Sequence, residues 1–554
     1  MALKRTQFFD LIKQRLKRLN VNYQIKRMAG QVAQHAHPDQ AHRPVVFFNA
    51  STRLVGMSLN ASFALLASWA LRLQGIPVIQ FICQAGMSYC VLGTSRKDPA
   101  QPPPCKACIA QSRVLYSRTE VSPFIYQPDQ ELRAALQGLT LKQLQEFCLP
   151  FDKTLGSHSN TSNRDAFIPL GKLVMPSVRW VLRRNSLQDD EPTRFLLKEY
   201  ILSAQHVSSK FSILLSQIDP IAVVVFNGQF FPEATVRWVS QFRGIRSITH
   251  EVGLQPFSAF FTTGEATAYP LTIPDEFELD EKQNSRLDKY LEHRFQGKFS
   301  MAGIHFWPEI KGLDASLEKR MKAFDQVVPV FTNVIFDTSQ PHSNVLFTDM
   351  FTWLDLVLKV ASAHPETIFI IRAHPDEDRP GKESQESVRQ WADSRQLAQF
   401  PNILFIPAAQ RLSSYELIQQ AKFVMIYNST IGLEASLMGA AVLCAGRSRF
   451  TQLPTVFFPA TLEEYSHKLE EFLSTGKIFV PPHFQRNARR FLYYQLYRSS
   501  LPFGDYLEED DIWPGFVKLR QFKPHKLSPA SSPTMKSILT GILENGDFLL
   551  DADL

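Results

Sequence analysis

The chain has 554 residues, 44% of them hydrophobic and 20% charged, which excludes a disordered protein and predicts two or more globular domains. Its net charge of +7, from 60 basic and 53 acidic residues, suits anionic partners such as nucleotide phosphates and excludes the dense basic surface of a nucleic-acid-binding protein. No stretch has the roughly 18 apolar residues that a membrane-spanning helix needs, and the N-terminus lacks the apolar region of a signal peptide. We therefore expect a cytoplasmic protein with no nucleic-acid partner.

The chain begins with a basic amphipathic segment, residues 1–40. Its first thirty residues hold eight Lys and Arg side chains against one acid, Asp10. Apolar side chains recur at helical spacing in this segment, namely Phe8, Ile12, Leu16, Leu19 and Tyr23. Such a helix either lies through residues 1–30 on an anionic membrane, here the inner face of the plasma membrane, or packs its apolar stripe on the body of the protein.

Alternating strands and helices begin after residue 40. Short apolar runs separated by helical patterns are typical of βαβ units in a parallel sheet. The expected strands of the first half are Val45 to Phe48, Val78 to Ile82, Ile221 to Phe226 and Arg246 to Thr249. Residues 109 to 215 are expected to be mainly helical. Residues 41–322 are thus predicted to form a Rossmann-like domain.

A second series of the same kind follows a polar stretch, residues 262 to 322. Its expected strands are Val327 to Phe331, Thr367 to Ile371, Ile403 to Ile406, Phe423 to Tyr427 and Ala441 to Cys444. Residues 323–500 are predicted to form a second Rossmann-like domain, and residues 501–554 an irregular C-terminal tail. The sequence therefore predicts an α/β protein with two doubly wound domains that face a cleft.

Two cationic or donor side chains follow one strand of the second domain. Arg372 and His374 stand two positions apart, and Pro375 comes next. Ligands bind at the carboxyl ends of the strands in open parallel sheets, so these side chains are candidates for holding phosphate. A His-Pro pair after a strand can also simply form a turn and bind nothing, and this alternative stays open.

A later strand of the same domain ends in small polar residues that open a helix. Asn428, Ser429 and Thr430 can bind phosphate through N–H groups and hydroxyls, and Glu434 is near enough to reach ribose hydroxyls. The plainer alternative is an N-cap hydroxyl followed by a solvated glutamate. Together with the His-Pro element before it, the run favours a nucleotide site.

The two motifs resemble the donor-binding half of GT-B glycosyltransferases, particularly those that make capsules and other surface polysaccharides. The resemblance rests on RAHP at 372–375 and NSTIGLEASLMGAAV at 428–442, and it covers residues 325 to 450. Related enzymes with a His-Pro and a Ser/Thr motif use CMP-sugars, and CDP-glycerol transferases have a comparable pair. The first half resembles these enzymes only in architecture, through FNGQ at 226–229 and HEVG at 250–253.

The resemblance implies roles for individual residues. The Arg and His of the first motif would hold donor phosphate, Ser429 and Thr430 would bind phosphate, and Glu434 would contact the ribose. The hydroxyl motif leaves the donor base open. Retaining relatives often carry a second Glu where this chain has Ile426, which favours inversion.

Further candidates stand at other strand ends. Thr332 and Asn333 are predicted donor contacts, with Asp337 a weaker one. An inverting enzyme needs a general base, which GT-B enzymes place in the N-terminal domain. Glu251 is the candidate, and His374 is the second residue assigned to catalysis. A structural turn carboxylate is the alternative role for Glu251.

The acceptor side is predicted around the first strand of the first domain. Its candidate residues are Asn49, Arg53 and Gly56 in the loop 49 to 60, and Asn227 after another strand. No Asp-x-Asp motif stands in a suitable place, and GT-B enzymes generally need no metal for chemistry. We therefore expect no catalytic metal.

Four of the six cysteines fall within 26 residues. Cys83, Cys90, Cys105 and Cys108 form the pattern C-x6-C-x14-C-x2-C. Thiolates grouped in a reducing compartment suit a structural Zn²⁺, which the spacing favours, and an iron–sulfur cluster also fits four thiolates. Independent buried thiols are the third interpretation.

The sequence thus predicts a glycosyltransferase that moves a sugar from a nucleotide-sugar donor to a glycan or lipid-linked acceptor in surface polysaccharide biosynthesis. Two alternatives stay open. One is a nucleotide-sugar 2-epimerase or a CDP-glycerol-type glycerophosphotransferase on the same fold. The other is a non-catalytic GT-B scaffold protein.

Overall fold

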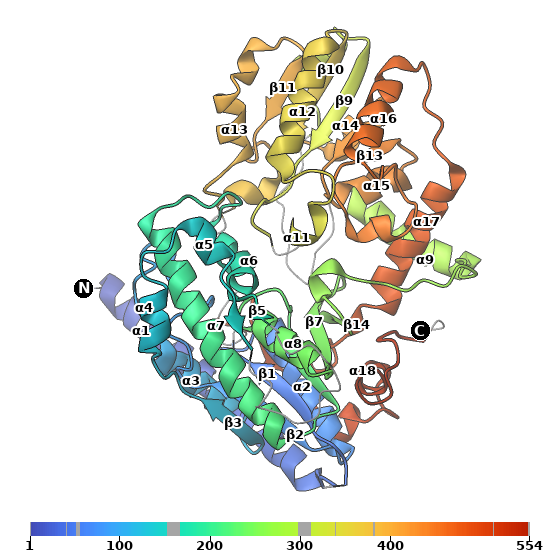
Figure 1. Cartoon of the computed structure of the whole chain (residues 1–554). Coiled ribbons are helices and arrows are strands. Elements are labelled where there is room, and N and C mark those ends of the chain that lie inside the picture. Colours follow the sequence, from blue (N-terminus) through green and yellow to red (C-terminus); the bar gives the residue numbers. More distant parts are fainter. Residues whose placement is uncertain are drawn as a thin grey trace.

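The computed structural model describes residues 2–39, 41–50, 56–151, 167–296, 312–337, 340–379, 383–512 and 515–551, with side chains from Lys13 onward. Two α/β halves lie one above the other, each built around its own sheet (Figure 1). Both sheets are mainly parallel, so the predicted α/β class is confirmed.

The sheet of the first half has seven strands in the order β14-β8-β7-β6-β1-β2-β3. The strands β3-β2-β1-β6-β7 are parallel, which is the doubly wound order, and β8 and β14 add antiparallel strands at one edge. The strands are β1 Val45–Asn49, β2 Val78–Cys83, β3 Glu120–Phe124, β6 Ala222–Phe226, β7 Arg246–Val252, β8 Ser258–Thr262 and β14 Leu501–Pro502. Two short pairs lie outside this sheet: β4 Leu149–Pro150 with β5 Phe167–Ile168, and β15 Leu507–Glu509 with β16 Val517–Leu519.

Helices cover both faces of this sheet, because its central strands are buried on both faces. Every residue of β1 and β2 is buried. The helices of the first half are α2 Leu59–Leu73, α3 Cys105–Leu115, α4 Gln130–Ala135, α5 Leu141–Gln145, α6 Leu170–Leu182, α7 Glu191–Gln217, α8 Glu233–Phe242 and η2 Ala266–Ala268.

The sheet of the second half has five parallel strands in the order β11-β10-β9-β12-β13. These strands are β9 Gln326–Phe331, β10 Thr367–Arg372, β11 Ile403–Ile406, β12 Val424–Ile426 and β13 Val442–Cys444. The strand order reverses between β9 and β12, as it does between β1 and β6 in the first half. Such reversal points open a crevice at the carboxyl ends of the strands.

Helices also flank the second sheet, with buried apolar faces turned to it. They are α10 Ala315–Met321, α11 Gln340–Ser343, α12 Met350–Ala363, η3 Pro375–Asp378, α13 Val388–Ser394, η4 Leu397–Gln399, α14 Ser414–Gln419, α15 Ile431–Leu437, η5 Arg449–Gln452, α16 Leu462–Ser474, α17 Pro482–Tyr493 and the π-helix η6 Tyr494–Arg498.

Three strands of the first half, β3 and the short β4 and β5, lie in a region expected to be mainly helical. The strand β3 is a sheet edge, and of its side chains only Phe124 is fully buried. It therefore lacks the continuous apolar run that marks the central strands.

The C-terminal segment also differs from the expected tail. Residues 501–551 return to the first half, where β14 pairs with β8 and α18 (Pro533–Leu543) packs in the same hydrophobic core as α2. The helix α9 (Glu281–Phe295) lies before the expected junction at 322, but its buried leucines pack in the core of the second half. The chain therefore crosses between the halves earlier than expected, and it crosses back.

The first helix, α1 (Ala2–His35), packs on the first half through its C-terminal part. Buried Ile25, Met28, Ala29 and Val32 join its core. The apolar side chains of Leu16, Leu19 and Tyr23 are 61%, 58% and 64% exposed. These three side chains are the described part of the predicted apolar stripe, and they do not pack on the body of the protein. In the described part of the chain, no helix is both long and apolar enough to cross a bilayer.

Candidate functional site

The ends of β9 and β10 are tied together by Thr332. Its hydroxyl donates to the carbonyl of Arg372 over 3.0 Å and accepts the backbone N–H of His374 over 3.1 Å. Thr332 is buried, and both roles of its hydroxyl are used within the protein. The structure therefore places Thr332 beneath the His-Pro loop, where it positions His374.

Arg372 is a buried guanidinium without an acidic partner. Its Nη1 donates to the hydroxyl of Ser414 over 2.6 Å, and among the described residues no carboxylate forms an ion pair with it. Burial lowers the pKa of Arg372 to about 10, so the side chain still carries its charge at neutral pH. A desolvated cation of this kind is stabilised when an anion binds beside it.

His374 presents one ring nitrogen as a donor. Its Nδ1 accepts the backbone N–H of Asp376 over 3.1 Å, so the proton of the neutral ring is carried by Nε2. Burial lowers the pKa of His374, and the charge of Arg372 acts in the same direction. The ring is therefore neutral at physiological pH, with Nε2–H as a hydrogen-bond donor.

Asn333 and Asn428 meet at the reversal point of the second sheet. The Oδ1 atom of Asn333 accepts the backbone N–H of Asn428 over 3.2 Å, and the amide of Asn428 donates to Ser343. The carbonyl of Asn428 accepts the hydroxyl of Ser448 over 2.9 Å. The two predicted donor contacts are thus brought together, and they shape the crevice between β9 and β12.

Ser429 and Thr430 keep their hydroxyls available. Thr430 occupies the N-cap position of α15, but its side chain makes no capping hydrogen bond. Ser429 is buried, Thr430 is exposed, and neither hydroxyl has a hydrogen-bond partner among the described residues. The N-cap alternative therefore lacks the hydrogen bond that defines it.

Glu434 lies in a buried ionic network instead of on a solvated surface. Its Oε1 accepts Nη2 of Arg294 over 2.5 Å, and its Oε2 accepts the hydroxyl of Tyr415 over 2.5 Å. Both oxygens are thus engaged within the protein, and Arg294 comes from α9. The predicted ribose contact stays a prediction, but the side chain has a clear structural role.

Glu251 lies near the carboxyl end of β7 in the first sheet, where neutral groups donate hydrogen bonds to its carboxylate. Asn227 donates to its Oε2 over 2.8 Å, and Asn60 and the backbone N–H of Val252 each donate to its Oε1 over 3.1 Å. Burial raises the pKa of Glu251, and the carboxylate of Asp337 acts in the same direction. Among the described residues, Glu251 forms no ion pair with a cation.

The other acceptor-side candidates differ in what holds them in place. The amide of Asn49 is buried and donates to Gln80 over 2.6 Å, and Gly56 has a φ of +77°, a conformation that favours glycine. Asn227 also has a positive φ, of 60°, and its Oδ1 caps the turn after β6. Arg53 lies outside the described residues.

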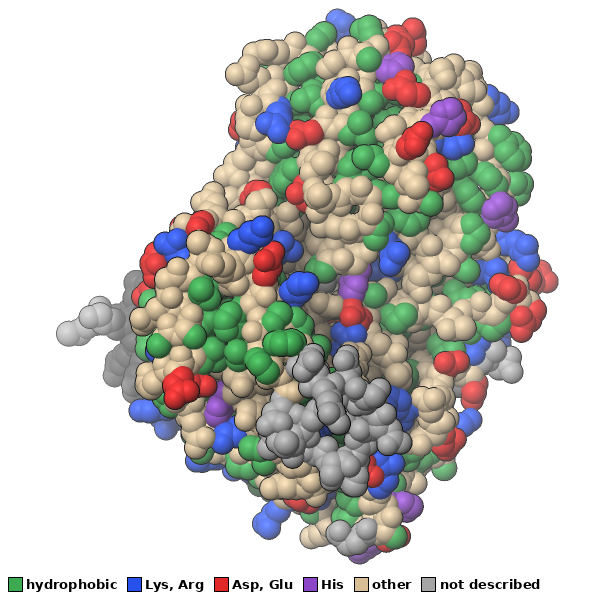
Figure 2. All heavy atoms as spheres, viewed as in Figure 1, with side chains coloured by type: hydrophobic (Ala, Val, Ile, Leu, Met, Phe, Trp, Pro, Cys, Tyr) green, Lys and Arg blue, Asp and Glu red, His purple; other side chains and the backbone are tan. Residues whose placement is uncertain are grey.

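The charge of Asp337 acts on candidate residues of both halves. Its negative charge raises the pKa of Glu251 in the first half and opposes the lowering of the pKa of His374 in the second. It also acts on Tyr269, whose ring stacks under the guanidinium of Arg449 at 4.0 Å. Asp337 therefore lies close enough to candidate residues of both halves to act on them electrostatically. Figure 2 shows the surface hollowed between the halves, with acidic, basic and His side chains gathered there.

Arg183 was missed by sequence reasoning. It follows α6 with a φ of 57°, is buried, and lies over the rings of Trp180 and Phe336 at 4.3 and 4.4 Å. Its Nε and Nη2 atoms have no hydrogen-bond partner among the described residues, and burial lowers its pKa to about 10. The end of a helix carries no local signal of this role, because Phe336 comes from the other half.

His342 links the halves beside this space. Its Nε2 lies 2.9 Å from Oε2 of Glu265 and 3.1 Å from the hydroxyl of Thr267. Hydrogen bonding to His342 and the charge of Arg237 hold the pKa of Glu265 at about 2, against the effect of burial. Glu265 is therefore ionised throughout the physiological range.

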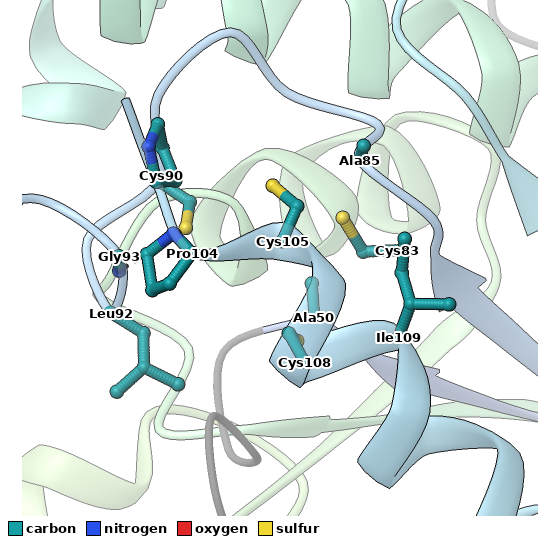
Figure 3. Close-up of a pocket in the computed structure, with 11 residues that line it drawn as sticks. Ala50, Cys83, Ala85, Cys90, Leu92, Gly93, Pro104, Cys105, Cys108 and Ile109 are labelled. Carbon is teal, nitrogen blue, oxygen red and sulfur yellow. Dashed lines mark hydrogen bonds between the residues drawn. The ribbon is translucent and has the colours of Figure 1, made fainter. Parts of the chain in front are cut away.

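The four clustered cysteines line one small pocket of the first half (Figure 3). Burial raises the pKa of Cys90, and its three neighbouring thiols act in the same direction. The structure therefore brings the predicted thiol set together. In the described ranges no group of three or more His, Cys, Asp and Glu side chains stands ready to hold a metal ion.

Comparison with known proteins found a family match that lies mainly in the second half of the chain. Residues 287–454 match the family model described as "Capsule polysaccharide biosynthesis protein". Protein FixF of Sinorhizobium fredii (strain NBRC 101917 / NGR234) is 26% identical over 234 residues, which are 42% of this chain and 49% of that protein. The chain thus spans about half the length of this curated relative.

Two solved structures are also similar. The beta Kdo 2,4 transferase KpsC of Thermosulfurimonas dismutans matches with a TM-score of 0.34 and 12% identity, over 50% of this chain and 80% of that one. UDP-GlcNAc 2-epimerase of Neisseria meningitidis matches with a TM-score of 0.20 and 12% identity, over 82% and 99%. The family match covers both donor motifs, so the predicted resemblance to capsule polysaccharide biosynthesis proteins is confirmed for residues 287–454.

Proposed function

We propose that the chain is a glycosyltransferase of the GT-B type that moves a sugar from a nucleotide-sugar donor to a glycan or lipid-linked acceptor in surface polysaccharide biosynthesis. The family match of the second half supports this proposal. The observation that carries it is the end of β10, where the buried guanidinium of Arg372 forms no ion pair among the described residues and His374 offers an Nε2–H donor. The charge of Asp337 acts on both Glu251 and His374, which supports a shared space where acceptor and donor meet.

On the donor side, the leaving nucleotide phosphate gains negative charge as the bond to the sugar breaks. Arg372 offers a buried positive charge, His374 a neutral Nε2–H donor, and Ser429 and Thr430 offer hydroxyls. Groups that are in place before the reaction stabilise the developing charge with little reorganisation. The proposal needs no divalent cation for this step.

On the acceptor side, Glu251 takes the proton of the acceptor hydroxyl. The acceptor oxygen then forms a bond to the anomeric carbon on the face opposite the phosphate, and the phosphate leaves with the electron pair of the broken bond. This displacement inverts the anomeric centre. A raised pKa suits the role, since a general base is most efficient when its pKa is near the working pH.

The test is a transfer assay with CMP-, CDP-, UDP- and GDP-sugars, with and without an acceptor glycan. We expect Glu251→Gln to lose on the order of 10²–10⁴-fold in kcat while it keeps its affinity for nucleotide. His374→Ala should lose both transfer and nucleotide affinity. Arg395→Ala, which alters an exposed ion pair with Asp355, is the control and should behave as the wild type.

Each other outcome decides against the transferase proposal. Wild-type turnover by both active-site variants contradicts it. A donor that changes without any acceptor indicates a 2-epimerase, and transfer of glycerol phosphate indicates the glycerophosphotransferase. If no nucleotide raises the melting temperature at millimolar concentration, the scaffold alternative replaces the enzyme, because a ligand of the folded state stabilises it by mass action.

We also propose that α1 holds the enzyme against an anionic membrane, at the inner face of the plasma membrane, where lipid-linked acceptors lie. The exposed apolar stripe of Leu16, Leu19 and Tyr23 supports this, together with exposed basic side chains on the same helix. Each Lys or Arg near an anionic surface adds about 1 kcal/mol, and apolar side chains enter the interface.

Co-sedimentation with vesicles tests this membrane proposal. Wild-type protein should pellet with vesicles that contain phosphatidylglycerol and remain in solution with pure phosphatidylcholine. Replacing Leu16, Leu19 and Tyr23 with Ser should abolish pelleting. Phe479→Ser removes a side chain that is 77% exposed elsewhere, and it should change nothing. Pelleting of the triple variant at the wild-type level would disprove the proposal.

A further inference from the structure

Four cysteine thiols from three segments of the first half meet at one pocket. Cys83 ends β2, Cys90 lies in the loop that follows, and Cys105 and Cys108 lie in the first turn of α3 (Figure 3). The pocket has an empty volume of about 350 Å³. Small or apolar residues complete its lining, among them Ala50, Ala85 and Gly93. The surroundings are therefore nearly free of oxygen and nitrogen ligands that compete with sulfur.

Cys83 and Cys90 each begin a Cys-x-x-Gly turn of the same kind. The backbone N–H of Gly86 donates to Sγ of Cys83 over 3.2 Å, and that of Gly93 donates to Sγ of Cys90 over 3.3 Å. A thiol sulfur is a weak acceptor, whereas hydrogen bonds to metal-bound thiolates orient the ligand and tune the metal. The repeated turn thus gives two of the sulfurs an N–H donor of the kind that metal-bound thiolates accept.

Gly93 cannot be replaced without opening this arrangement. A Cβ atom at Gly93 would lie 2.7 Å from Cβ of Pro103 and 3.0 Å from Sγ of Cys90. The glycine thus lets two distant parts of the loop approach the sulfur. This close packing brings the two Cys-x-x-Gly turns and the Cys-x-x-Cys turn of α3 to the same place.

The pocket closes a long irregular loop. Residues 84–104 contain no helix or strand, and ordered loops of this length are uncommon in a compact domain and usually functional. The same loop carries Arg96, whose guanidinium lies 5.0 Å over the ring of Trp180 and whose charge lowers the pKa of Arg183. Whatever holds the loop at the thiol pocket therefore also holds a cation near the space between the halves.

We propose that Cys83, Cys90, Cys105 and Cys108 form a tetrathiolate metal centre that braces the loop 84–104. Zinc ions and iron–sulfur clusters both take four thiolates, and binding releases the thiol protons to solvent. The described thiols do not stand at the spacing of ligands on one ion, and a cluster accepts ligands that are farther apart than a single ion does. The centre is separate from the transfer chemistry and does not depend on it.

Metal analysis of the full chain tests the centre. The protein is purified without oxygen from cells supplied with iron and zinc, and iron, zinc and acid-labile sulfide are measured after a mild chelator wash. We expect bound metal in stoichiometric amount, and its loss in Cys90→Ser and Cys105→Ser. Cys148→Ser is the matched control, because Cys148 is an exposed thiol outside the pocket, and it should retain the metal. Iron with sulfide and visible absorption identifies a cluster, as the spacing of the thiols favours, whereas colourless protein with zinc shows that the thiols move together around a single ion.

A second measurement on the wild type guards against variants that lose metal because they fail to fold. Removing the metal with a strong chelator should make the four thiols reactive to an alkylating reagent, as counted by mass spectrometry, and should open the loop 84–104 to a protease. Returning zinc, or iron with sulfide, should restore both kinds of protection. Metal-free protein as purified, equal metal in Cys105→Ser and Cys148→Ser, or a Cys105–Cys108 disulfide overturns the proposal. Each of these results leaves the transferase proposal standing.

Discussion

Asn227 donates from Nδ2 to Oε2 of Glu251 over 2.8 Å, and Asn60 donates to the other carboxylate oxygen over 3.1 Å. Both partners are neutral amides, so they orient the carboxylate without cancelling its charge. Burial raises the pKa of Glu251, and these hydrogen bonds oppose the rise because they favour the charged form.

Asn60→Ala should therefore shift the pH dependence of transfer. Loss of one hydrogen bond to the carboxylate raises the pKa of Glu251, and a base acts only when deprotonated, so kcat/KM should rise with pH over a higher range than in the wild type. We expect the acidic limb to move upward by about 0.5–1 pH unit. Asn284→Ala, which alters an amide near α9, should leave the limb in place. An unmoved limb in Asn60→Ala would remove Glu251 as the base.

Arg372→Ala should weaken nucleotide binding by about 10–100-fold, since a hydrogen bond to a charged group is worth about 1.5–3 kcal/mol. The effect should be measured by calorimetry with the nucleotide that the donor screen identifies. Arg372→Lys keeps the charge but loses the planar donor fork, so its affinity should fall between the two. Equal affinity in all three proteins would place the phosphate elsewhere in the crevice.

Thr430 and Thr461 provide a matched pair of N-cap positions. Thr461 accepts the backbone N–H of Glu464 over 3.1 Å, whereas Thr430 makes no such bond. Thr461→Ala should cost about 1 kcal/mol of unfolding free energy and leave nucleotide affinity unchanged. Thr430→Ala should show the opposite pattern in denaturant titration and calorimetry. If Thr430→Ala loses stability but not affinity, its hydroxyl has only a structural role.

Glu434→Gln tests whether the carboxylate is structural. Arg294 loses its charged partner in a buried setting, and breaking a buried ion pair costs about 3–5 kcal/mol. Urea unfolding should detect the change. Glu278→Gln alters an exposed ion pair with Arg486 and should have little effect. Unchanged stability of Glu434→Gln with weaker nucleotide binding would favour the ribose contact instead.

The sequence predicted the strands that are apolar on both faces. Fully buried runs such as Thr367 to Ile371 predict a strand directly, because a central parallel strand has no polar face. The strand β3 was missed, since a half-exposed edge has no such run. The donor motifs were found because each follows a predicted strand directly.

The roles of several site residues could not be predicted, because they depend on contacts between segments that are distant in the sequence. The pairing of β9 with β10 turns Thr332 into a support for His374, and strand order cannot be read from a local pattern. Arg294 reaches Glu434 from a helix 140 residues earlier in the chain. Arg183 gains its place only because Trp180 and Phe336 enclose it from two halves.

The return of residues 501–551 to the first half has a consequence for how the molecule can move and be divided. Two separate stretches of backbone join the halves, one before α9 and one after η6, so opening is restricted to rotation about an axis that passes near both. A fragment that stops at residue 500 would expose the edge of β8 and the apolar surface that α18 covers. The first half therefore completes its fold only after the second half has been synthesised.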